Sequence, residues 1–253
     1  MKKIVGVIPS RYAAQRFPGK PLAPIAGVPM VVRVIRQALK AKKLTEVWVA
    51  TDDERIAQVV EKAGARAVMT PAACKSGTDR IAFAVKGQKL DIVVNIQGDE
   101  PVIAPSAIDA AVEVLQKDSR VLMSTVVIPS RNAQEWRDPN IVKAVLTSKG
   151  DVLYFSRAPV PHSRDGGTPL FYKHMGLYGY RPQWLQKMAG LKPTPLELTE
   201  KLEQLRAMEN GVMLRAAVRK VESVAVDVPA DVKKVEKYLN QRRAPKRESR
   251  QSS

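Results

Sequence analysis

The first half of the chain alternates short apolar runs with segments of helical spacing, and this alternation limits the possible folds more than any other feature. The apolar runs, each about the length of a buried strand, lie at 4–9, 47–51, 66–70 and 91–97. The helical segments lie at 30–44, 52–64 and 78–87. Strands that alternate with helices of this length predict an α/β fold with a doubly wound, mixed and mostly parallel sheet of the Rossmann type.

The second half follows a different pattern. Strand-like runs without full helices between them lie at 121–129, 141–147, 151–157 and 173–181. Apolar residues recur at helical spacing over 196–211, which predicts one amphipathic helix. A final helix is expected over 229–241, with Pro229 near its first turn. We therefore expect a smaller second-half sheet lobe, a return of the chain to the first half, and then a polar, basic and disordered tail.

Composition limits the class of protein. A chain of 253 residues allows one good-sized domain that carries a smaller lobe. The single cysteine, Cys74, excludes an intramolecular disulfide framework and favours a reducing compartment. No apolar run reaches the roughly 18 residues of a membrane helix, and the run at 4–8 is too short for a signal peptide. We expect a cytoplasmic protein without a membrane partner.

The charge of the chain is unusual. Lysine and arginine number 42 against 25 aspartate and glutamate residues, which gives a formal net charge of +17. A basic chain suits an anionic partner such as a nucleotide, a nucleic acid or a membrane surface. Aromatic residues make up only 5% of the chain and do not interleave with basic ones, which disfavours single-strand binding. A basic surface that serves solubility is slightly favoured over nucleic-acid binding.

A basic loop follows the first predicted strand. Its sequence, SRYAAQRFPGKPL, holds Arg11, Arg16 and Lys20, and Gly19 allows a ligand to approach the backbone closely. Ligands of α/β sheets bind at the carboxyl ends of the strands, and three cations can neutralise a polyphosphate. The loop matches neither the Walker A nor the GxGxxG pattern. Composition alone favours a polyphosphate site and a solvated basic loop equally.

Two more motifs accompany the predicted strands of the first half. Asp99 and Glu100 of QGDEP stand where a strand ends, and a carboxylate there can hold Mg²⁺ that bridges phosphate oxygens. Ser76 and Thr78 of SGTDR can bond either a ligand or the start of a helix. For each motif alone, a turn or a helix cap is the more common interpretation.

The motifs together resemble the 3-deoxy-manno-octulosonate cytidylyltransferases, or CMP-Kdo synthetases, nearly from end to end. The resembling segments, in chain order, are IPSRYAAQRFPGKPL, VATDDERI, SGTDR, VNIQGDEP, LYFSRAPVP, KHMGLYGYR, PLELTEKLEQLR and VDVPADV. PGKPL and QGDEP indicate only the wider sugar nucleotidyltransferase superfamily, whereas YFSRAPVP, HMGLYGYR and LEQLR are more specific. The resemblance implies a nucleotide-diphospho-sugar transferase fold and Mg²⁺-dependent transfer of CMP from CTP to a 3-deoxy sugar acid.

The resemblance also implies an organisation of the chain. A single nucleotidyltransferase domain would span 1–240, and 241–253 would form the disordered basic tail. Within the domain, 1–128 would bind the nucleotide, 129–220 would bind the sugar and dimerise, and 221–240 would return to the core. Homodimers are typical of the family, so we expect a homodimer, and we do not expect nucleic acid as a partner.

Site residues follow from the matched motifs. The implied catalytic residues are Arg11, Lys20, Asp99 and Asp227, of which Asp99 and Asp227 would hold Mg²⁺ while Arg11 and Lys20 bind the triphosphate. The further nucleotide-binding residues are Ser76, Gly77, Arg80 and Gln97. The implied sugar-binding residues are Arg16, Gln97, Arg157, His174, Tyr178, Glu203 and Gln204.

The residues of the sugar-binding set have plainer interpretations when the resemblance is set aside. An arginine suits the carboxylate of a sugar acid, and Glu or Gln can hold vicinal hydroxyls. His174 in an apolar strand would more often be a packed core histidine, and one of Tyr178 and Tyr180 would be core. Glu203 and Gln204 would more often lie on a solvated helix face.

The chain departs from the family pattern near the sugar and dimer side. Cys74 stands where the family commonly has His, His162 where Trp is common, and Leu198 where His is frequent. These departures bear on substrate identity more than on reaction type. Transfer of CMP to a related acid, such as 8-amino-Kdo or a sialic-acid-like sugar, therefore stays open. A basic nucleic-acid-binding protein is the alternative from another class.

Overall fold

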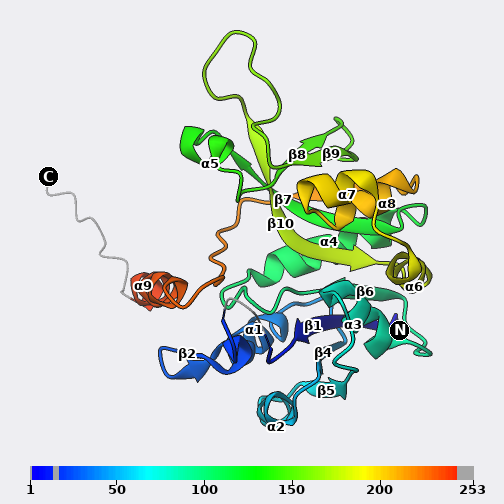
Figure 1. Ribbon diagram of the computed structural model, residues 1–253, viewed down its shortest axis with the longest axis vertical. Helices are drawn as coiled ribbons and strands as arrows, with labels where there is room; N and C mark the ends of the chain where they lie inside the picture. The colour runs from blue at the N-terminus through cyan, green and yellow to red at the C-terminus, as the bar shows by residue number, and fades with distance from the viewer. Residues whose placement is uncertain (1, 14–16, 244–253) are drawn as a thin grey trace, which may run out of the picture.

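One nine-stranded sheet organises the protein, a computed structural model of which describes residues 2–13 and 17–243 (Figure 1). The strands are β1 (Ile4–Ser10), β4 (Glu46–Thr51), β5 (Arg66–Met69), β6 (Ile92–Asn95), β7 (Met123–Ser130), β8 (Lys143–Leu146), β9 (Val152–Ser156), β10 (Phe171–Tyr180) and β11 (Leu214–Val218). The sheet order is β11-β7-β10-β6-β1-β4-β5, and β8 and β9 extend it from β10. β2 (Pro24–Ile25) and β3 (Val28–Pro29) form a separate hairpin.

Strand directions confirm the predicted α/β class and mixed sheet. β1 pairs in parallel with β4 and β6, and β4 pairs in parallel with β5, so the first-half strands form the parallel region. β10 joins antiparallel to both β6 and β7, whereas β11 runs parallel to β7. The carboxyl ends of β1 and β6 therefore lie at the same edge, where an α/β sheet offers a ligand site.

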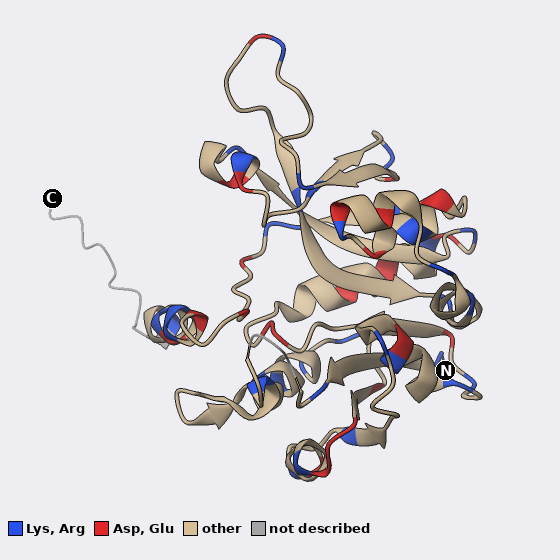
Figure 2. Cartoon of the chain, viewed as in Figure 1, with Lys and Arg blue, Asp and Glu red and all other residues tan. Residues whose placement is uncertain are grey.

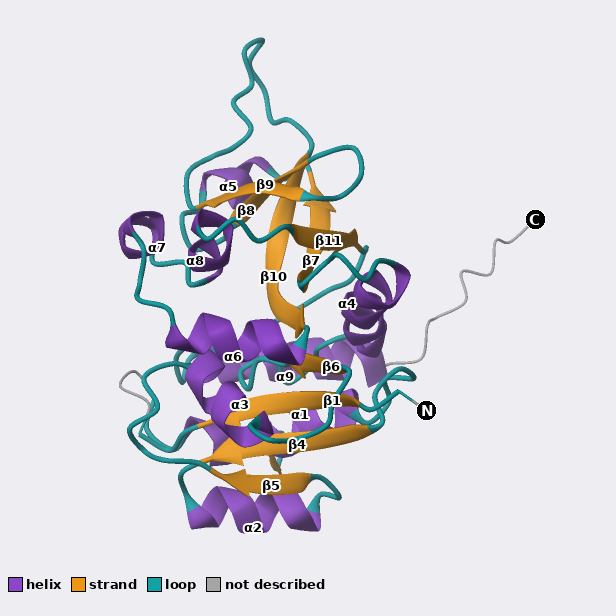
Figure 3. Ribbon diagram, turned by 90° about the vertical axis from the view of Figure 1, so that its right-hand side faces the viewer, coloured by secondary structure: helices purple, strands orange, loops and turns teal. Residues whose placement is uncertain are grey.

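Helices cover both faces of the sheet (Figure 3). The helices are α1 (Met30–Ala38), α2 (Glu54–Lys62), α3 (Gly77–Val85), α4 (Pro105–Lys117), α5 (Ala133–Arg137), α6 (Pro182–Gly190), α7 (Pro195–Glu200), α8 (Gln204–Glu209) and α9 (Asp231–Arg243). On β1, Ile4 and Ile8 pack with α1, α2 and α4, while Val5 and Val7 pack with α3, α6 and α8. Strand side chains alternate between faces, so one buried strand supplies both cores.

The single helix predicted over 196–211 is wrong, because α7 and α8 are separate. Lys201 ends α7 with a φ of 55°, a left-handed conformation that continues no helix. The carboxylate of Glu200 accepts hydrogen bonds from the Ser156 hydroxyl at 2.6 Å and from the Arg157 backbone N–H at 2.9 Å. These bonds fix the end of α7 to β9, and this tertiary contact overrides the helical periodicity.

Several elements lie outside the sequence prediction. α4 and α6 flank the strand-like runs of the second half, and β11 forms the edge of the sheet beside β7. α1 ends at Ala38, earlier than the helical spacing indicates. The last helix begins at Asp231, so Pro229 precedes it, and it runs to Arg243, three residues into the segment expected to be a disordered tail. Residues 244–253 lie outside the described part of the chain.

The chain returns to the first half after β11. Val226 and Val235 are fully buried against Ile25, Met30 and Val102, so the return segment and α9 share a small core with the first loop region. This packing carries Asp227 back to the edge of the sheet where β1 and β6 end. Within the described residues, no helix is both long and apolar enough to cross a membrane.

Candidate active site

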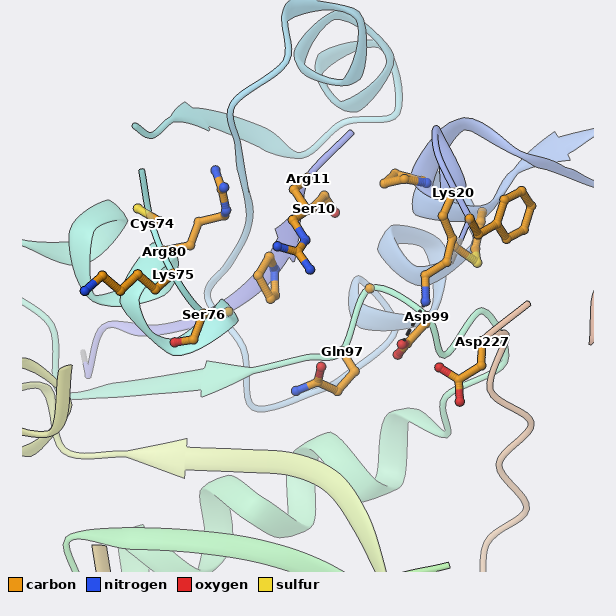
Figure 4. A pocket seen from close by; sticks show the side chains of 16 residues that line it. Ser10, Arg11, Lys20, Cys74, Lys75, Ser76, Arg80, Gln97, Asp99 and Asp227 are labelled. Atoms are coloured by element: carbon orange, nitrogen blue, oxygen red, sulfur yellow. Dashed lines mark hydrogen bonds and ion pairs between the residues drawn. The ribbon is translucent and has the colours of Figure 1, made fainter. Parts of the chain in front are cut away.

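A cavity of about 460 Å³ opens at the carboxyl ends of β1 and β6 (Figure 4). It is bounded by the first loop, the start of α3, the turn after β6 and the return segment. The predicted residues that line it are Arg11, Lys20, Ser76, Gly77, Arg80, Gln97, Asp99 and Asp227. The fold thus gathers all the expected catalytic and nucleotide-binding residues from four distant stretches of sequence.

The cavity carries more positive than negative charge. Its cations are Arg11, Lys20, Lys75 and Arg80, and its carboxylates are Asp99 and Asp227. The Arg11 side chain is exposed and makes no ion pair with another residue in the described ranges, so its guanidinium is open to an anion. A surplus of cations over carboxylates suits a polyphosphate and attracts it from solution.

Backbone geometry explains how Arg11 and Lys20 reach one cavity. The Gly19 N–H donates to the Tyr12 carbonyl at 2.9 Å, which closes the loop onto its own start. Gly19 has a φ of 71°, and a Cβ there would lie 3.3 Å from the Tyr12 hydroxyl, so a side chain would be both strained and crowded. Lys20 then begins a short 3₁₀ helix, η1 (Lys20–Leu22). Arg16, the third predicted cation, lies outside the described residues.

Lys20 joins the two acidic segments of the cavity. Its ammonium donates to Asp99 Oδ2 at 3.0 Å and to the Val226 carbonyl at 2.8 Å. Asp99 lies in the turn after β6, and Asp227 directly follows Val226 in the return segment. Both carboxylates line the cavity, and Figure 4 shows Lys20 reaching Asp99. Next to Asp99, burial raises the pKa of Glu100 to about 7.

The start of α3 forms the opposite wall. Ser76 is the N-cap of α3, where its hydroxyl accepts from the Asp79 N–H at 3.1 Å, so the plain helix-cap interpretation of SGTDR is correct. Ser76 nevertheless lines the cavity, together with Gly77. Arg80 is almost fully buried, and its guanidinium donates to Asp52 Oδ2 at 2.9 Å and to the Thr70 hydroxyl. Arg80 is therefore fixed in place beside the cavity.

The donor set of the cavity fits a magnesium ion. Mg²⁺ is usually held by one or two carboxylates plus substrate phosphates, not by a cage made only of protein ligands. Asp99 and Asp227 provide two such carboxylates in one cavity. No cluster of three or more His, Cys, Asp or Glu residues suited to a metal ion occurs among residues 2–13 and 17–243.

The predicted sugar residues of β10 lie outside the cavity lining, in an aromatic row. The His174 ring centroid lies 4.8 Å from that of Phe155 and 5.3 Å from that of Tyr178, and Tyr178 and Tyr180 are 6.0 Å apart. His174 Nε2 is 3.0 Å from the Thr125 hydroxyl, and burial lowers the pKa of His174 to about 3. Tyr180 is buried in the core, whereas Tyr178 is half-buried.

Glu203 and Gln204 are not on a solvated helix face. Glu203 Oε2 accepts from the Thr78 hydroxyl at 2.7 Å, which joins the LEQLR and SGTDR motifs, while Glu203 Oε1 is buried without a hydrogen bond from the described residues. Gln204 is 4% exposed, and its Nε2 likewise has no partner there. Glu203 Oε1 does have an ion pair with the Arg206 guanidinium at 3.7 Å. Buried polar atoms are normally satisfied, so Gln204 Nε2 marks a place for a polar ligand.

The Arg157 side chain is held by backbone carbonyl groups. Its guanidinium donates to the carbonyls of Glu200 at 2.7 Å and Pro139 at 2.9 Å, so it fixes the end of α7. Gln97 lies between the cavity residues and the aromatic row of β10. It lines the cavity, and its Cγ packs closely against Gly176 of β10, where a Cβ would be only 3.3 Å away. Gly176 falls where the β10–β7 register shifts between Met175 and Tyr178. This irregularity brings β10 against the cavity wall.

Comparison with known proteins places this arrangement in a family. A family model described as "Cytidylyltransferase" matches residues 5–223. The chain is 51% identical over 242 residues to the 3-deoxy-manno-octulosonate cytidylyltransferase of Myxococcus xanthus, covering 95% of this chain and 98% of the relative. The chain belongs to the 3-deoxy-manno-octulosonate cytidylyltransferase family. A relative of the same name from Geobacter metallireducens is 46% identical over 249 residues, with 94% of this chain and 98% of the relative covered.

Solved structures agree with this assignment. The structure of CMP:2-keto-3-deoxy-manno-octonic acid synthetase complexed with CTP superposes with a TM-score of 0.90 at 38% identity, covering 95% of this chain and all of that one. A cytidylyltransferase from Leptospira borgpetersenii reaches a TM-score of 0.64 at 16% identity, covers 95% of this chain and 88% of that one, and shares the fold alone.

Sequence reasoning missed some cavity residues. Ser10, at the end of β1, is 3% exposed and its hydroxyl has no hydrogen-bond partner in the described ranges. It lines the cavity, as do Lys75 and Phe17. Asp52, which holds Arg80, follows β4 directly, so the strand-end rule that selects Asp99 would have found it. Cys74, one of the departures, is half-buried and also lines the cavity.

Proposed function

We propose that this protein transfers CMP from CTP to the anomeric hydroxyl of 3-deoxy-D-manno-octulosonate (Kdo), giving CMP-Kdo and diphosphate. The observation that carries the proposal is the cavity that gathers Arg11, Lys20, Asp99 and Asp227 at one edge of the sheet. Relatives that cover nearly the whole chain are named for this reaction, and a structural neighbour is complexed with CTP. The product would supply lipopolysaccharide synthesis.

The cavity suits a displacement at the α-phosphate. The sugar hydroxyl attacks phosphorus, a new P–O bond forms, and the bond to the β-phosphate oxygen breaks to release diphosphate. Such a step depends on positioning and charge neutralisation more than on covalent catalysis. Arg11 and Lys20 would bind the triphosphate oxygens and stabilise the charge that builds up on the leaving diphosphate. Ser76 and Gly77 would lie at the cytidine, where Arg80 is held by Asp52.

Asp99 and Asp227 would hold Mg²⁺. When bound with the nucleotide, this ion supplies positive charge to the phosphate oxygens and restrains their geometry. The two carboxylates are supported by opposite parts of the chain, the turn after β6 and the return segment before α9. Lys20, which donates to Asp99, keeps the two acidic segments close together.

The sugar acid would bind beside the cavity, toward the second-half lobe. Gln97 would contact both substrates, because it lines the cavity and packs against β10 at Gly176. His174, Tyr178, Glu203 and Gln204 would contact the sugar, and Gln204 Nε2, which has no hydrogen-bond partner among the described residues, is suited to its hydroxyls. Arg157 would act on its carboxylate. A related sugar acid stays possible through the departures at Cys74, His162 and Leu198.

The protein would act as a homodimer in the cytoplasm. Exposed large apolar side chains of the second half include Leu153, Leu170, Leu196 and Leu198, with exposed fractions of 59%, 42%, 39% and 53%. Within the described residues, β9, which carries Leu153, pairs with β8 alone and forms an edge strand. Exposed apolar groups and an open strand edge favour association. Light scattering at micromolar concentration should give the mass of two chains, and a monomer mass would contradict this proposal.

Diphosphate release tests the reaction. With CTP and Mg²⁺, release should require Kdo and should be slow in parallel reactions with 8-amino-Kdo or sialic acid. Release only with another acid would keep the mechanism and change the substrate. The alternative, a nucleic-acid-binding protein, predicts steeply salt-dependent RNA or DNA binding and no release. Basic residues are distributed over many helices and loops (Figure 2), and the enzymatic residues are intact, so this alternative rests on net charge alone.

A further inference from the structure

The return segment that carries Asp227 is attached to the Asp99 turn by hydrogen bonds of three kinds. The Val226 N–H donates to the Asp99 carbonyl at 2.9 Å. Lys20 bridges Asp99 Oδ2 and the Val226 carbonyl at 3.0 and 2.8 Å. The Ser223 hydroxyl donates to Glu100 Oε2 at 2.7 Å. These contacts join the two segments that carry Asp99 and Asp227, which are far apart in sequence.

The Ser223–Glu100 bond differs from the other two contacts. Neither residue lines the cavity, so neither is placed to touch the nucleotide. Glu100 is 7% exposed, and a hydrogen bond to a buried carboxyl group is costly to lose. The Lys20 ammonium would bind a phosphate as well as Asp99 and the Val226 carbonyl. The Ser223 hydroxyl would bind only Glu100.

The return segment is the less regular part of the pair. Asp99 and Glu100 lie in a short turn between the central strand β6 and the helix α4, both of which are packed in the core. Between β11 and α9, residues 219–230 form neither helix nor strand. The contacts that the return segment makes with the Asp99 turn therefore help to set the position of Asp227, together with the packing of Val226 and the bond from the Asp227 N–H to Asp231 Oδ2 at 3.0 Å.

We propose that Ser223 is a positioning residue, which holds Asp227 at the separation from Asp99 that a shared metal ion requires by donating to Glu100. The proposal rests on the magnesium site of the proposed function. Mg²⁺ demands near-ideal octahedral geometry with ligands at about 2.1 Å, so it tolerates little displacement of one carboxylate. Residues that orient metal ligands through hydrogen bonds commonly affect metal affinity by roughly 10- to 100-fold.

Three variants of the full chain test this role. Ser223→Ala removes the donor, and Ser223→Thr keeps a hydroxyl in the same place. Ser130→Ala is the matched control, because the Ser130 hydroxyl also donates to a glutamate, Glu135 Oε2, at 2.7 Å, but far from the cavity. The probe is Mn²⁺, whose binding to the protein in the presence of CTP and without a sugar acid is followed by electron paramagnetic resonance.

The expected result is weaker Mn²⁺ binding by roughly tenfold in Ser223→Ala, with Ser223→Thr and Ser130→Ala close to the wild type. In turnover assays, Ser223→Ala should need more Mg²⁺ but should approach the wild-type kcat at saturating Mg²⁺. A general loss of folded protein would lower kcat without this split.

Two other outcomes separate the proposals. If the wild type binds Mn²⁺ with CTP and Ser223→Ala binds it equally well, the positioning role is wrong while the magnesium site stands. If the wild type binds no Mn²⁺ with CTP and turns over without a divalent ion, the magnesium site fails and the role of Ser223 fails with it.

Discussion

At the scale of single residues, the candidate active site is built from side chains that lie at strand ends. Asp99 is placed by the turn after β6, and Lys20 by a loop that closes through the hydrogen bond between Tyr12 and Gly19. Both were predictable, because the carboxyl ends of parallel strands meet at one edge. Arg157 is different: its donors go to the carbonyls of Glu200 and Pro139, which no sequence pattern indicates.

Replacing Asp99 should separate catalysis from folding. Asp99→Asn keeps the size of the side chain and an acceptor for Lys20 but loses the charge that would hold Mg²⁺. We expect kcat to fall by roughly 100-fold or more, as when one electrostatic contact to a transition state is removed. Asp91→Asn, at the opposite end of β6, should turn over like the wild type. Diphosphate release and thermal unfolding are the measurements, and normal turnover of Asp99→Asn would show that the metal assignment is wrong.

Arg157 should affect the sugar acid more than CTP. Arg157→Ala removes the guanidinium next to α7, where the sugar carboxylate would bind. The KM for Kdo should rise by roughly tenfold or more, since a charge-assisted hydrogen bond is worth roughly 1.5–3 kcal/mol. Arg164→Ala, in the long connection before β10, is the control. An equal rise in the KM of both substrates would assign Arg157 to folding of the α7 region alone.

At the scale of elements, the sequence predicts regular pieces better than interruptions. The strands and helices of the first half follow from alternating apolar runs, because each piece buries its own face in the core. The break between α7 and α8 does not follow, because it results from Glu200 bonding to Ser156 and Arg157, far away in sequence. The sequence does not predict β11 for a similar reason, because this segment becomes a strand by pairing with β7, which is far away in sequence.

The break itself should be a source of strain. Lys201 adopts a φ of 55°, a conformation that costs a residue with a side chain roughly 1–2 kcal/mol. Lys201→Gly should therefore raise the free energy of unfolding by roughly 0.5–1 kcal/mol, after allowing for the greater freedom of glycine in the unfolded chain. Lys86→Gly, at an exposed residue with a φ of −58°, should lower it instead. Urea unfolding of both variants measures these changes. Destabilisation by Lys201→Gly would show that Lys201 is not strained.

At the scale of the whole molecule, the second-half lobe makes stability depend on pH. His174 lies in that lobe, and burial holds its pKa at about 3, below the usual value of about 6.5. The folded protein therefore keeps His174 neutral while the unfolded chain takes up a proton below about pH 6.5. Its contribution to stability is present above that pH and is lost progressively as the pH falls toward 3.

This linkage gives a pH prediction for unfolding. Between pH 7 and pH 5 the free energy of unfolding of the wild type should fall relative to that of His174→Gln, because Glu100, whose raised pKa of about 7 contributes in the opposite direction, is present in both proteins. His162→Gln changes an exposed histidine of the long connection and should follow the wild type. Urea titrations at several pH values measure this. Parallel pH profiles for wild type and His174→Gln would show that His174 is equally accessible to protons in both states.

The proposed reaction forms a bond between CMP and the anomeric oxygen of Kdo. Phosphorus NMR of the reaction of CTP with Kdo labelled with ¹³C at C2 tests it most directly. One new phosphodiester resonance is expected, split by coupling to the labelled carbon, together with free diphosphate. Appearance of CMP without this coupling would mean that water, not the sugar acid, receives the nucleotide, and would contradict the proposed function.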